Sequence, residues 1–334
     1  MTKDFSGIEG RELLVATYDQ LRWYVKGLFG PGCYILASKP KVGKSIFLLQ
    51  LGVSLVSGRA LLDTFEVCQA DACLLELEDG LRRAQQRLWL IADEVPGGLR
   101  IVEEAQRLDT GLLDQIKADH EHHPQTGLYV IDTFAAVRPP DAEYSYQADY
   151  NAVKSLADLA TSLGVCVILV HHCRKAIGFG DAFDGISGTN GLTAGATGMI
   201  VLAKDQRDSG KVIMSATGKD IEEAAWRIEL AGGKWRMVES MTPHDVASYS
   251  VPECVLATIR WMSGRCDRWV GTTTELYGEV GVEDVSVNAY GKYLAQHRGF
   301  MLDEGIDFKR RHARNGNIVS LIFREELDNA AREM

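Results

Sequence analysis

The 334-residue chain is predicted to be an α/β protein whose mostly parallel sheet is extended by antiparallel strands and followed by a small α+β module. Three features of the sequence predict this fold class. Apolar, strand-like runs alternate with helical segments up to Val170. Closely spaced strands with glycine-containing turns follow between Met199 and Val238. After Pro243, three helical segments precede a single hairpin.

These patterns divide the chain into three parts. Residues 1–31 form a lead-in with a short amphipathic helix around Leu13–Tyr24, and residues 32–242 form the α/β domain. Residues 243–334 form the C-terminal module. Its order of three helices and a hairpin around an Asn-Gly turn at 315–316 is typical of a winged helix. We therefore expect two folded domains behind a short leading segment.

The composition favours a soluble cytoplasmic protein without a membrane partner. The chain is 46% hydrophobic and 25% charged, and no apolar run has the length of a membrane span or a signal peptide. Seven cysteines include no C-x-x-C pair, so buried thiols in a reducing compartment are expected rather than disulfides or zinc ligands. The net charge of −10 argues against a surface coated in nucleic acid, although a local basic channel is compatible with it.

A phosphate-binding loop organises the first domain. The apolar strand Cys33–Ala37, a small basic loop and the helix that starts near Ile46 occur in the order that such a loop needs. Loop N–H groups and the helix N-terminus then face one point, where an anion is favoured. The residues expected to contact ATP are Ser38, Lys39, Pro40, Lys41, Val42, Gly43, Lys44, Ser45 and Ile46.

Three of these residues have individual tasks. Gly43 lets the backbone approach the phosphates, Lys44 brings its charge to the β- and γ-phosphates, and Ser45 is placed to bind Mg²⁺. Ser38 occupies the first position of the pattern, where glycine is usual, and its small side chain should preserve the turn. The alternative is a chance Gly-Lys-Ser in a lysine-rich turn, which the flanking strand and helix disfavour.

Two carboxylates follow apolar strands. Asp132 ends the run Leu128–Ile131, as a Walker B aspartate does, and would hold the Mg²⁺ shell; the alternative is that it caps a turn. Glu78 lies at the tip of the preceding strand and could polarise the attacking water as a general base. Glu76, two residues earlier on the same side of the strand, is the competing candidate.

A histidine pair ends the apolar strand Val165–Val170. One of the two, with His172 preferred over His171, could sense the γ-phosphate by a hydrogen bond and pass that state into the loop 173–190. Histidines at strand ends are otherwise often satisfied polar groups. No cysteine or carboxylate lies at ligand spacing, so a zinc site is not expected.

The chain resembles the RepA-like ATPases, which are RecA-fold proteins of plasmids, phages and integrative elements. The resemblance covers about residues 20–240. It implies a RecA-like core, a ring that is typically hexameric, ATP and Mg²⁺ as cofactors, and ATP-driven work on DNA during replication of a mobile element. The motifs that carry it, in chain order, are SKPKVGKS (38–45), LELEDG (75–80), LYVIDT (128–133), LVHHCRK (169–175), GISGTNGL (185–192) and SATGKDIEE (215–223).

The same resemblance implies the residue roles. It makes Lys44 the phosphate lysine, Glu78 the catalytic glutamate, Asp132 the Walker B acid and His172 the sensor. The residue that a neighbouring subunit donates in trans stays open. Relatives often carry arginine where this chain has Lys219, and the alternatives on the preceding hairpin are Arg207 and Lys204.

Contacts with DNA are expected in two places. Arg174 and Lys175 directly follow the sensor and would face single-stranded DNA in a central channel. In the C-terminal module, a recognition helix at 285–297 is weakly basic, whereas the hairpin carries Lys309, Arg310 and Arg311. From Val251 to the end, 11 basic residues stand against 13 acidic ones, so docking of a replication initiator or primase is a competing role for this module.

The sequence therefore predicts a Mg-ATPase of the RecA fold that forms a ring and acts on DNA as a replicative helicase or helicase-like motor. The alternative keeps the ATPase but makes it a regulatory or loader protein that binds DNA or a replication partner without unwinding. A nucleotide-independent DNA-binding regulator would need every nucleotide motif to be a relic, which their joint integrity disfavours.

Overall fold

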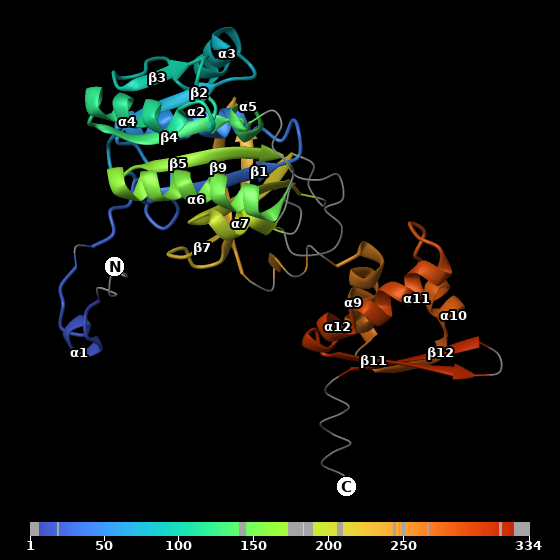
Figure 1. Cartoon of the computed structure of the whole chain (residues 1–334). Coiled ribbons are helices and arrows are strands. Elements are labelled where there is room, and N and C mark those ends of the chain that lie inside the picture. Colours follow the sequence, from blue (N-terminus) through green and yellow to red (C-terminus); the bar gives the residue numbers. More distant parts are fainter. Residues whose placement is uncertain are drawn as a thin grey trace.

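The computed structural model describes most of the chain, and Figure 1 shows its two sheets, each with its own helices. The larger sheet has nine strands and the smaller sheet has three. The described residues are 7–18, 20–139, 145–172, 183, 190–205, 210–242, 245–246, 248, 251–265, 267–313 and 316–323.

The nine-stranded sheet has the order β3-β2-β4-β5-β1-β6-β7-β8-β9. Strands β1 to β6 run parallel, and β6 to β9 form an antiparallel meander, so the predicted fold class is confirmed for this part of the chain. The strands are β1 Gly32–Ser38, β2 Asp71–Glu76, β3 Leu99–Val102, β4 Thr126–Asp132, β5 Cys166–His172, β6 Gly198–Lys204, β7 Lys211–Gly218, β8 Ala224–Ala231 and β9 Lys234–Met241.

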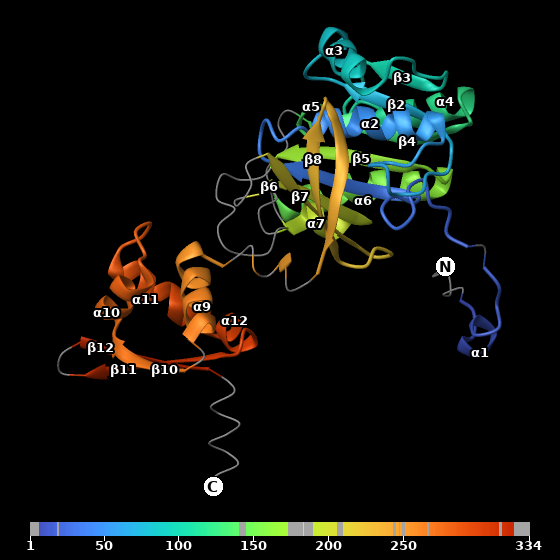
Figure 2. The same ribbon diagram turned by 180° about the vertical axis from the view of Figure 1, so that it is seen from behind.

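Helices cover both faces of this sheet (Figures 1 and 2), as right-handed crossovers between parallel strands require. The first long helix ends at Gly58, which takes the left-handed conformation that suits glycine. The helices of this part are α1 Gly10–Leu13, α2 Lys44–Ser57, α3 Leu81–Ile91, α4 Leu112–His122, α5 Phe134–Val137, α6 Tyr146–Leu163 and α7 Asn190–Gly195.

Alternation along the strands separates two hydrophobic cores. Tyr34 and Leu36 of β1 pack in the core under α2, whereas Ile35 and Ala37 pack in the core on the α4 and α6 side. Every residue of β1 is buried. The strand that leads into the phosphate loop is thus enclosed along its whole length, as β4 is too.

The C-terminal part forms a third, separate core around the sheet β10-β12-β11. Thr272 and Glu275 form a reciprocal capping box at the start of its second helix. The elements are α9 Glu253–Arg265, β10 Arg268–Thr272, α10 Thr273–Val280, α11 Val287–Gln296, α12 Arg298–Asp303, β11 Ile306–Ala313 and β12 Gly316–Phe323.

Three sequence predictions of local structure were wrong or incomplete. Among the described residues of the helix expected at Leu13–Tyr24, only Leu13 is helical, as the last residue of the single turn α1. The apolar side chains from Leu13 to Leu21 are exposed, and a helix this short is marginal by itself. The loop expected at Phe134–Tyr150 contains α5 and the first turn of α6. The hydrophobic pattern of the sequence also did not predict the short elements β10 and α12. Within the described part of the chain, no helix has both the length and the apolar composition needed to cross a membrane.

Candidate functional site

Four polar residues meet at one edge of the large sheet. The parallel strands β1, β2, β4 and β5 all end there, and their register sets Ser38 beside His172 and Glu76 beside Asp132. On each strand, the residues two and four positions earlier pack in the core under α2, so alternation turns all four side chains toward α2. In open α/β sheets this carboxyl edge is where ligands bind.

The phosphate loop joins β1 to α2 at this edge. Gly43 has a φ of 108°, which L-residues with a side chain rarely adopt, and the helix begins at Lys44. Lys44 is buried, and its ammonium group donates a hydrogen bond to the Ser38 hydroxyl at 3.0 Å. The serine that replaces the usual first glycine therefore holds the lysine of the loop.

Trp235 of β9 supports the loop from outside. Its indole Nε1–H donates to the carbonyl oxygen of Gly43 at 3.2 Å, and a Cβ atom on Gly43 would lie 2.7 Å from the indole ring. The Gln50 side chain of α2 accepts from the Trp235 backbone N–H at 2.7 Å and donates to its carbonyl at 2.8 Å. The last strand of the meander is thereby fastened to the loop and its helix.

Ser45 and Asp132 form the oxygen pair of the site. The Ser45 hydroxyl donates to a carboxylate oxygen of Asp132 at 3.1 Å. Burial raises the pKa of Asp132, the Ser45 hydrogen bond opposes this shift, and the nearby charge of Glu78 adds to it. A hydroxyl and a carboxylate are oxygen ligands of the kind Mg²⁺ prefers, so this pair fits that cation.

The two candidate glutamates have different surroundings. Glu78 lies just beyond β2 and is exposed, and its carboxylate accepts a hydrogen bond from the buried Thr133 hydroxyl at 2.8 Å. Glu76 is buried within β2, and burial together with the charge of Asp132 raises its pKa to about 7, against the lowering effect of Arg87. Only Glu78 thus combines solvent access with a fixed orientation.

The two histidines face opposite sides of the sheet. His171 follows the residues of β5 that pack in the α6-side core, and its ring meets Phe134 edge-on with centroids 6.3 Å apart. His172 lies on the α2 side beside Ser38, and its Nδ1 atom is buried without a hydrogen-bond partner among the described residues. Of the two histidines, His172 is therefore the one beside the start of the phosphate loop.

The remaining predicted residues lie elsewhere. Lys219 follows β7 at the edge opposite the phosphate loop, because β7 ends beside the start of β6, which runs parallel to β1. Lys204 ends β6 at the phosphate-loop edge. Arg174, Lys175 and Arg207 lie outside the described residues. Lys309, Arg310 and Arg311 belong to β11 of the small sheet.

Sequence reasoning did not identify Thr133 or Trp235 as parts of the site. Thr133 directly follows Asp132, and this position beside a candidate metal ligand could have indicated that Thr133 belongs to the site. Trp235 lies 192 residues after Gly43, and nothing in the pattern of β9 indicates that the sheet brings it back to the loop.

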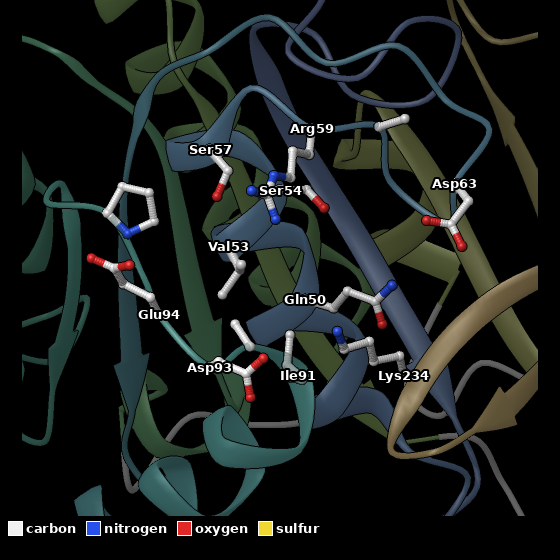
Figure 3. Close-up of a pocket in the computed structure, with 13 residues that line it drawn as sticks. Gln50, Val53, Ser54, Ser57, Arg59, Asp63, Ile91, Asp93, Glu94 and Lys234 are labelled. Atoms are coloured by element: carbon white, nitrogen blue, oxygen red, sulfur yellow. The ribbon is translucent and has the colours of Figure 1, made fainter.

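A separate hollow of about 600 Å³ lies at the opposite end of α2 (Figure 3). Ser54, Ser57 and Arg59 line it from the end of α2, Asp93 and Glu94 from the end of α3, and Lys234 from the start of β9. Because the phosphate loop precedes the first turn of α2, this hollow is distinct from the nucleotide site.

Fold and site together define a P-loop ATPase core of the RecA-like class. Residues 10–177 match the model of a protein family described as AAA domain. Because this match spans half of the chain, the chain belongs to that family. No curated protein sequence matches the chain.

Solved structures show the same fold at low sequence identity. The ATPase domain of G40P aligns with a TM-score of 0.51 and 15% identity, over 63% of this chain and 85% of that one. The structure of a DnaB-like replicative helicase and its interactions with primase aligns with a TM-score of 0.52 and 15% identity, over 65% of this chain. This chain covers 58% of that helicase chain, which is less than two thirds of its length.

Proposed function

We propose that the chain is an ATP-hydrolysing, ring-forming motor of the RecA fold that acts on DNA during replication of a mobile genetic element. One observation carries the ATPase part of this proposal: Lys44, Ser45, Asp132, Glu78 and His172 converge at the carboxyl edge of the sheet. Phosphoryl transfer needs a phosphate cradle, a metal and an oriented water, and this group of side chains supplies a residue for each.

The residues divide the work as follows. ATP supplies the γ-phosphoryl group when bound, and Mg²⁺ neutralises its charge. Lys44, which donates to Ser38 in this structure, would bind the phosphates, and the Ser45 hydroxyl and the Asp132 carboxylate would hold Mg²⁺. The exposed Glu78 carboxylate, oriented by Thr133, accepts a proton from the attacking water.

The sensor and the residue acting in trans complete the proposal. His172 lies beside the first residue of the phosphate loop, and its unpaired Nδ1 is available to report on the γ-phosphate. Lys219 lies at the sheet edge opposite the phosphate loop of its own chain. This position supports a role for it at the nucleotide site of a neighbouring subunit. Lys204 and Arg207 remain the competing candidates. Donation in trans needs an oligomer, and a hexameric ring is the assembly that we propose.

The DNA and partner roles follow the resemblance to RepA-like ATPases and the likeness to a DnaB-like helicase core. We propose that residues 32–242 form the motor domain, that Arg174 and Lys175 contact single-stranded DNA in a central channel, and that residues 243–334 form a winged-helix domain. The order of helices and strands from α9 to β12, with β12 central, supports the last point. A replication initiator or a primase is the proposed protein partner, and the cytoplasm the proposed location.

ATP hydrolysis by the purified protein, with and without single-stranded DNA, tests this function. We expect turnover that DNA accelerates, and its loss in Lys44→Ala and Glu78→Gln, with Glu78→Gln still binding ATP. Strand separation on a forked substrate then distinguishes the motor from a regulatory or loader ATPase, which would hydrolyse ATP without unwinding. Tight ATP binding without turnover on any DNA would count against the motor.

A further inference from the structure

The small C-terminal sheet has one face that no described helix covers. Trp269, Val319 and Leu321 turn toward the core with α9 to α12, which lie on one side of this sheet in Figures 1 and 2. Alternation turns their neighbours Arg268 and Ser320 to the opposite face. We call this opposite face of β10, β11 and β12 the outer sheet face.

The strand register sets cations across the outer sheet face. Lys309 lies beside Ser320, which lies beside Val270, and Arg311 lies beside Ile318. Arg268 shares a row with Ile322 and with Asp307, the carboxylate that pairs with Lys309 at 2.9 Å. The face therefore carries a diagonal of positive charge over a small apolar floor.

A groove of about 720 Å³ follows this face and the free edge of β11. Five of its lining residues are cations, and no carboxylate is among the described residues that line it. The cations are Arg268, Arg298, Lys309, Arg310 and Arg311.

Three of these guanidinium groups are available for a ligand. Arg268, Arg298 and Arg311 make no hydrogen bond or ion pair with any other described residue. Arg310 differs, because its guanidinium donates to the Gly291 carbonyl of α11 at 3.3 Å and so holds the helix to the sheet.

The part of the helix side formed by α10 and α11 has the opposite character. Helix α11 carries one basic residue, Lys292, and the adjoining segment from α10 carries Glu275, Glu279, Glu283 and Asp284. A polyanion would be repelled there and attracted to the outer sheet face.

We propose that the outer sheet face and its groove bind the phosphodiester backbone of nucleic acid, with Arg268, Arg298 and Arg311 as the phosphate contacts. Planar guanidinium forks suit phosphate oxygens, and the half-exposed Val270 offers an apolar contact to sugar or base. This inference deepens the proposed action on DNA, yet it concerns a surface separate from the nucleotide site and from the helix expected to read DNA.

Fluorescence anisotropy of the full-length protein without nucleotide tests the proposal. The probes are a fluorescein-labelled oligothymidylate and a labelled duplex, each titrated over a series of salt concentrations. We expect Arg268→Glu with Arg311→Glu to weaken binding. The slope of the logarithm of the binding constant against the logarithm of the salt concentration should become shallower, by about 0.7 per lost phosphate contact on the single strand or about 0.9 on the duplex. The probe whose binding changes more, single-stranded or duplex DNA, shows which of the two the groove binds. The milder pair Arg268→Gln with Arg311→Gln should show the same direction.

Arg59→Glu with Lys117→Glu is the matched control, since it makes the same charge change on the exposed surface of the large unit. Wild-type binding by the control and reduced binding by the groove pair support the proposal. The proposal would be overturned if both pairs lost the same affinity, or if the groove pair lost none. It would also be overturned if polyglutamate displaced the probe from the wild-type protein at a lower concentration than oligothymidylate does. Failure of the motor proposal shows separately, as absence of ATP turnover, which this measurement does not need.

Discussion

The indole N–H of Trp235 donates to the carbonyl oxygen of Gly43 at 3.2 Å, so the last strand of the large sheet braces the phosphate loop near the start of the chain. The same carbonyl accepts the Phe47 N–H in the first turn of α2. Gln50 binds both backbone groups of Trp235 and keeps the indole in place. The antiparallel extension of the sheet therefore has a direct part in shaping the site.

Replacing Trp235 by phenylalanine should raise the KM for ATP by about 2- to 10-fold with a smaller change in kcat, because one hydrogen bond that orients the loop is lost. Steady-state ATPase kinetics measure both constants. Trp226→Phe is the control, since Trp226 packs against Phe65 rather than the loop. Equal kinetics for wild type and Trp235→Phe would show that the loop keeps its form without the indole.

Thr133→Val should lower kcat about 10- to 100-fold while leaving ATP affinity close to that of the wild type. The Thr133 hydroxyl is 2.8 Å from the Glu78 carboxylate, and without it the exposed glutamate loses its orientation toward the attacking water. Single-turnover hydrolysis and nucleotide binding separate the two effects. Thr133→Ser keeps the hydroxyl and should stay active; an inactive serine variant would assign the loss to packing instead.

Lys219→Ala should be inactive alone and regain activity when mixed with Lys44→Ala. In a ring, one mixed interface joins an intact phosphate loop to an intact Lys219, which is the expected result if Lys219 acts in trans. ATPase assays over a series of mixing ratios measure the recovery. Lys204→Ala should not show this pattern, because Lys204 ends β6 at the edge of its own site. Recovery by Lys204→Ala alone would transfer the role to that residue.

The parts of the site that local patterns encode were predictable from the sequence. Lys44 and Ser45 lie in a contiguous motif. Asp132 ends a strand that is buried on both faces, so its sequence is a continuous run of apolar residues that indicates a strand. Parallel strands all end at one edge, so the meeting of these residues with Glu78 and His172 follows from the alternating order of strands and helices.

The tertiary contacts were not predictable in this way. Trp235 reaches Gly43 only because the meander returns β9 to α2, and the strand pattern of β9 does not contain that curvature. The expected helix at Leu13–Tyr24 failed for the opposite reason. Its apolar spacing is helical, but Leu14 and Val15 remain exposed, so no packing stabilises more than one turn.

Buried thiols should resist alkylation at a pH where exposed thiols react. Burial raises the pKa of the Cys73 thiol to about 11 and raises those of Cys33 and Cys166 as well, so these groups stay neutral where an unfolded thiol ionises above about 8.5. Iodoacetamide labelling at pH 9, followed by peptide mass spectrometry, should modify the exposed Cys68 before the buried Cys33, Cys73 and Cys166. Rapid labelling of Cys73 in the native protein would contradict its burial.

The same shift makes stability depend on pH. Between about pH 8.5 and about pH 11 the unfolded Cys73 thiol loses its proton while the native thiol keeps it, so the free energy of unfolding should fall as the pH rises through this range. Urea unfolding at several pH values measures the slope. Cys73→Ala should reduce the slope, and an unchanged slope would assign the pH dependence to other groups.

A buried ion pair between α5 and α6 should matter more to stability than an exposed pair on α6 itself. Arg138 lies 2.8 Å from Asp149, whose side chain is fully buried. Arg138→Met leaves the carboxylate without this partner and should lower the free energy of unfolding by about 3–5 kcal/mol. Lys154→Met breaks the exposed pair with Asp158 and should cost no more than about 0.5 kcal/mol, because solvent already screens that pair.

The double variant Arg138→Met with Asp149→Leu separates the contribution of the pair from the cost of removing Arg138 alone from the buried Asp149 carboxylate. Because it removes both charges, it should be more stable than Arg138→Met alone and recover much of the loss in urea unfolding. A double variant as unstable as the single one would mean that the pair itself, rather than the penalty of a buried carboxylate without Arg138, holds α6 against the segment that follows Asp132 and Thr133.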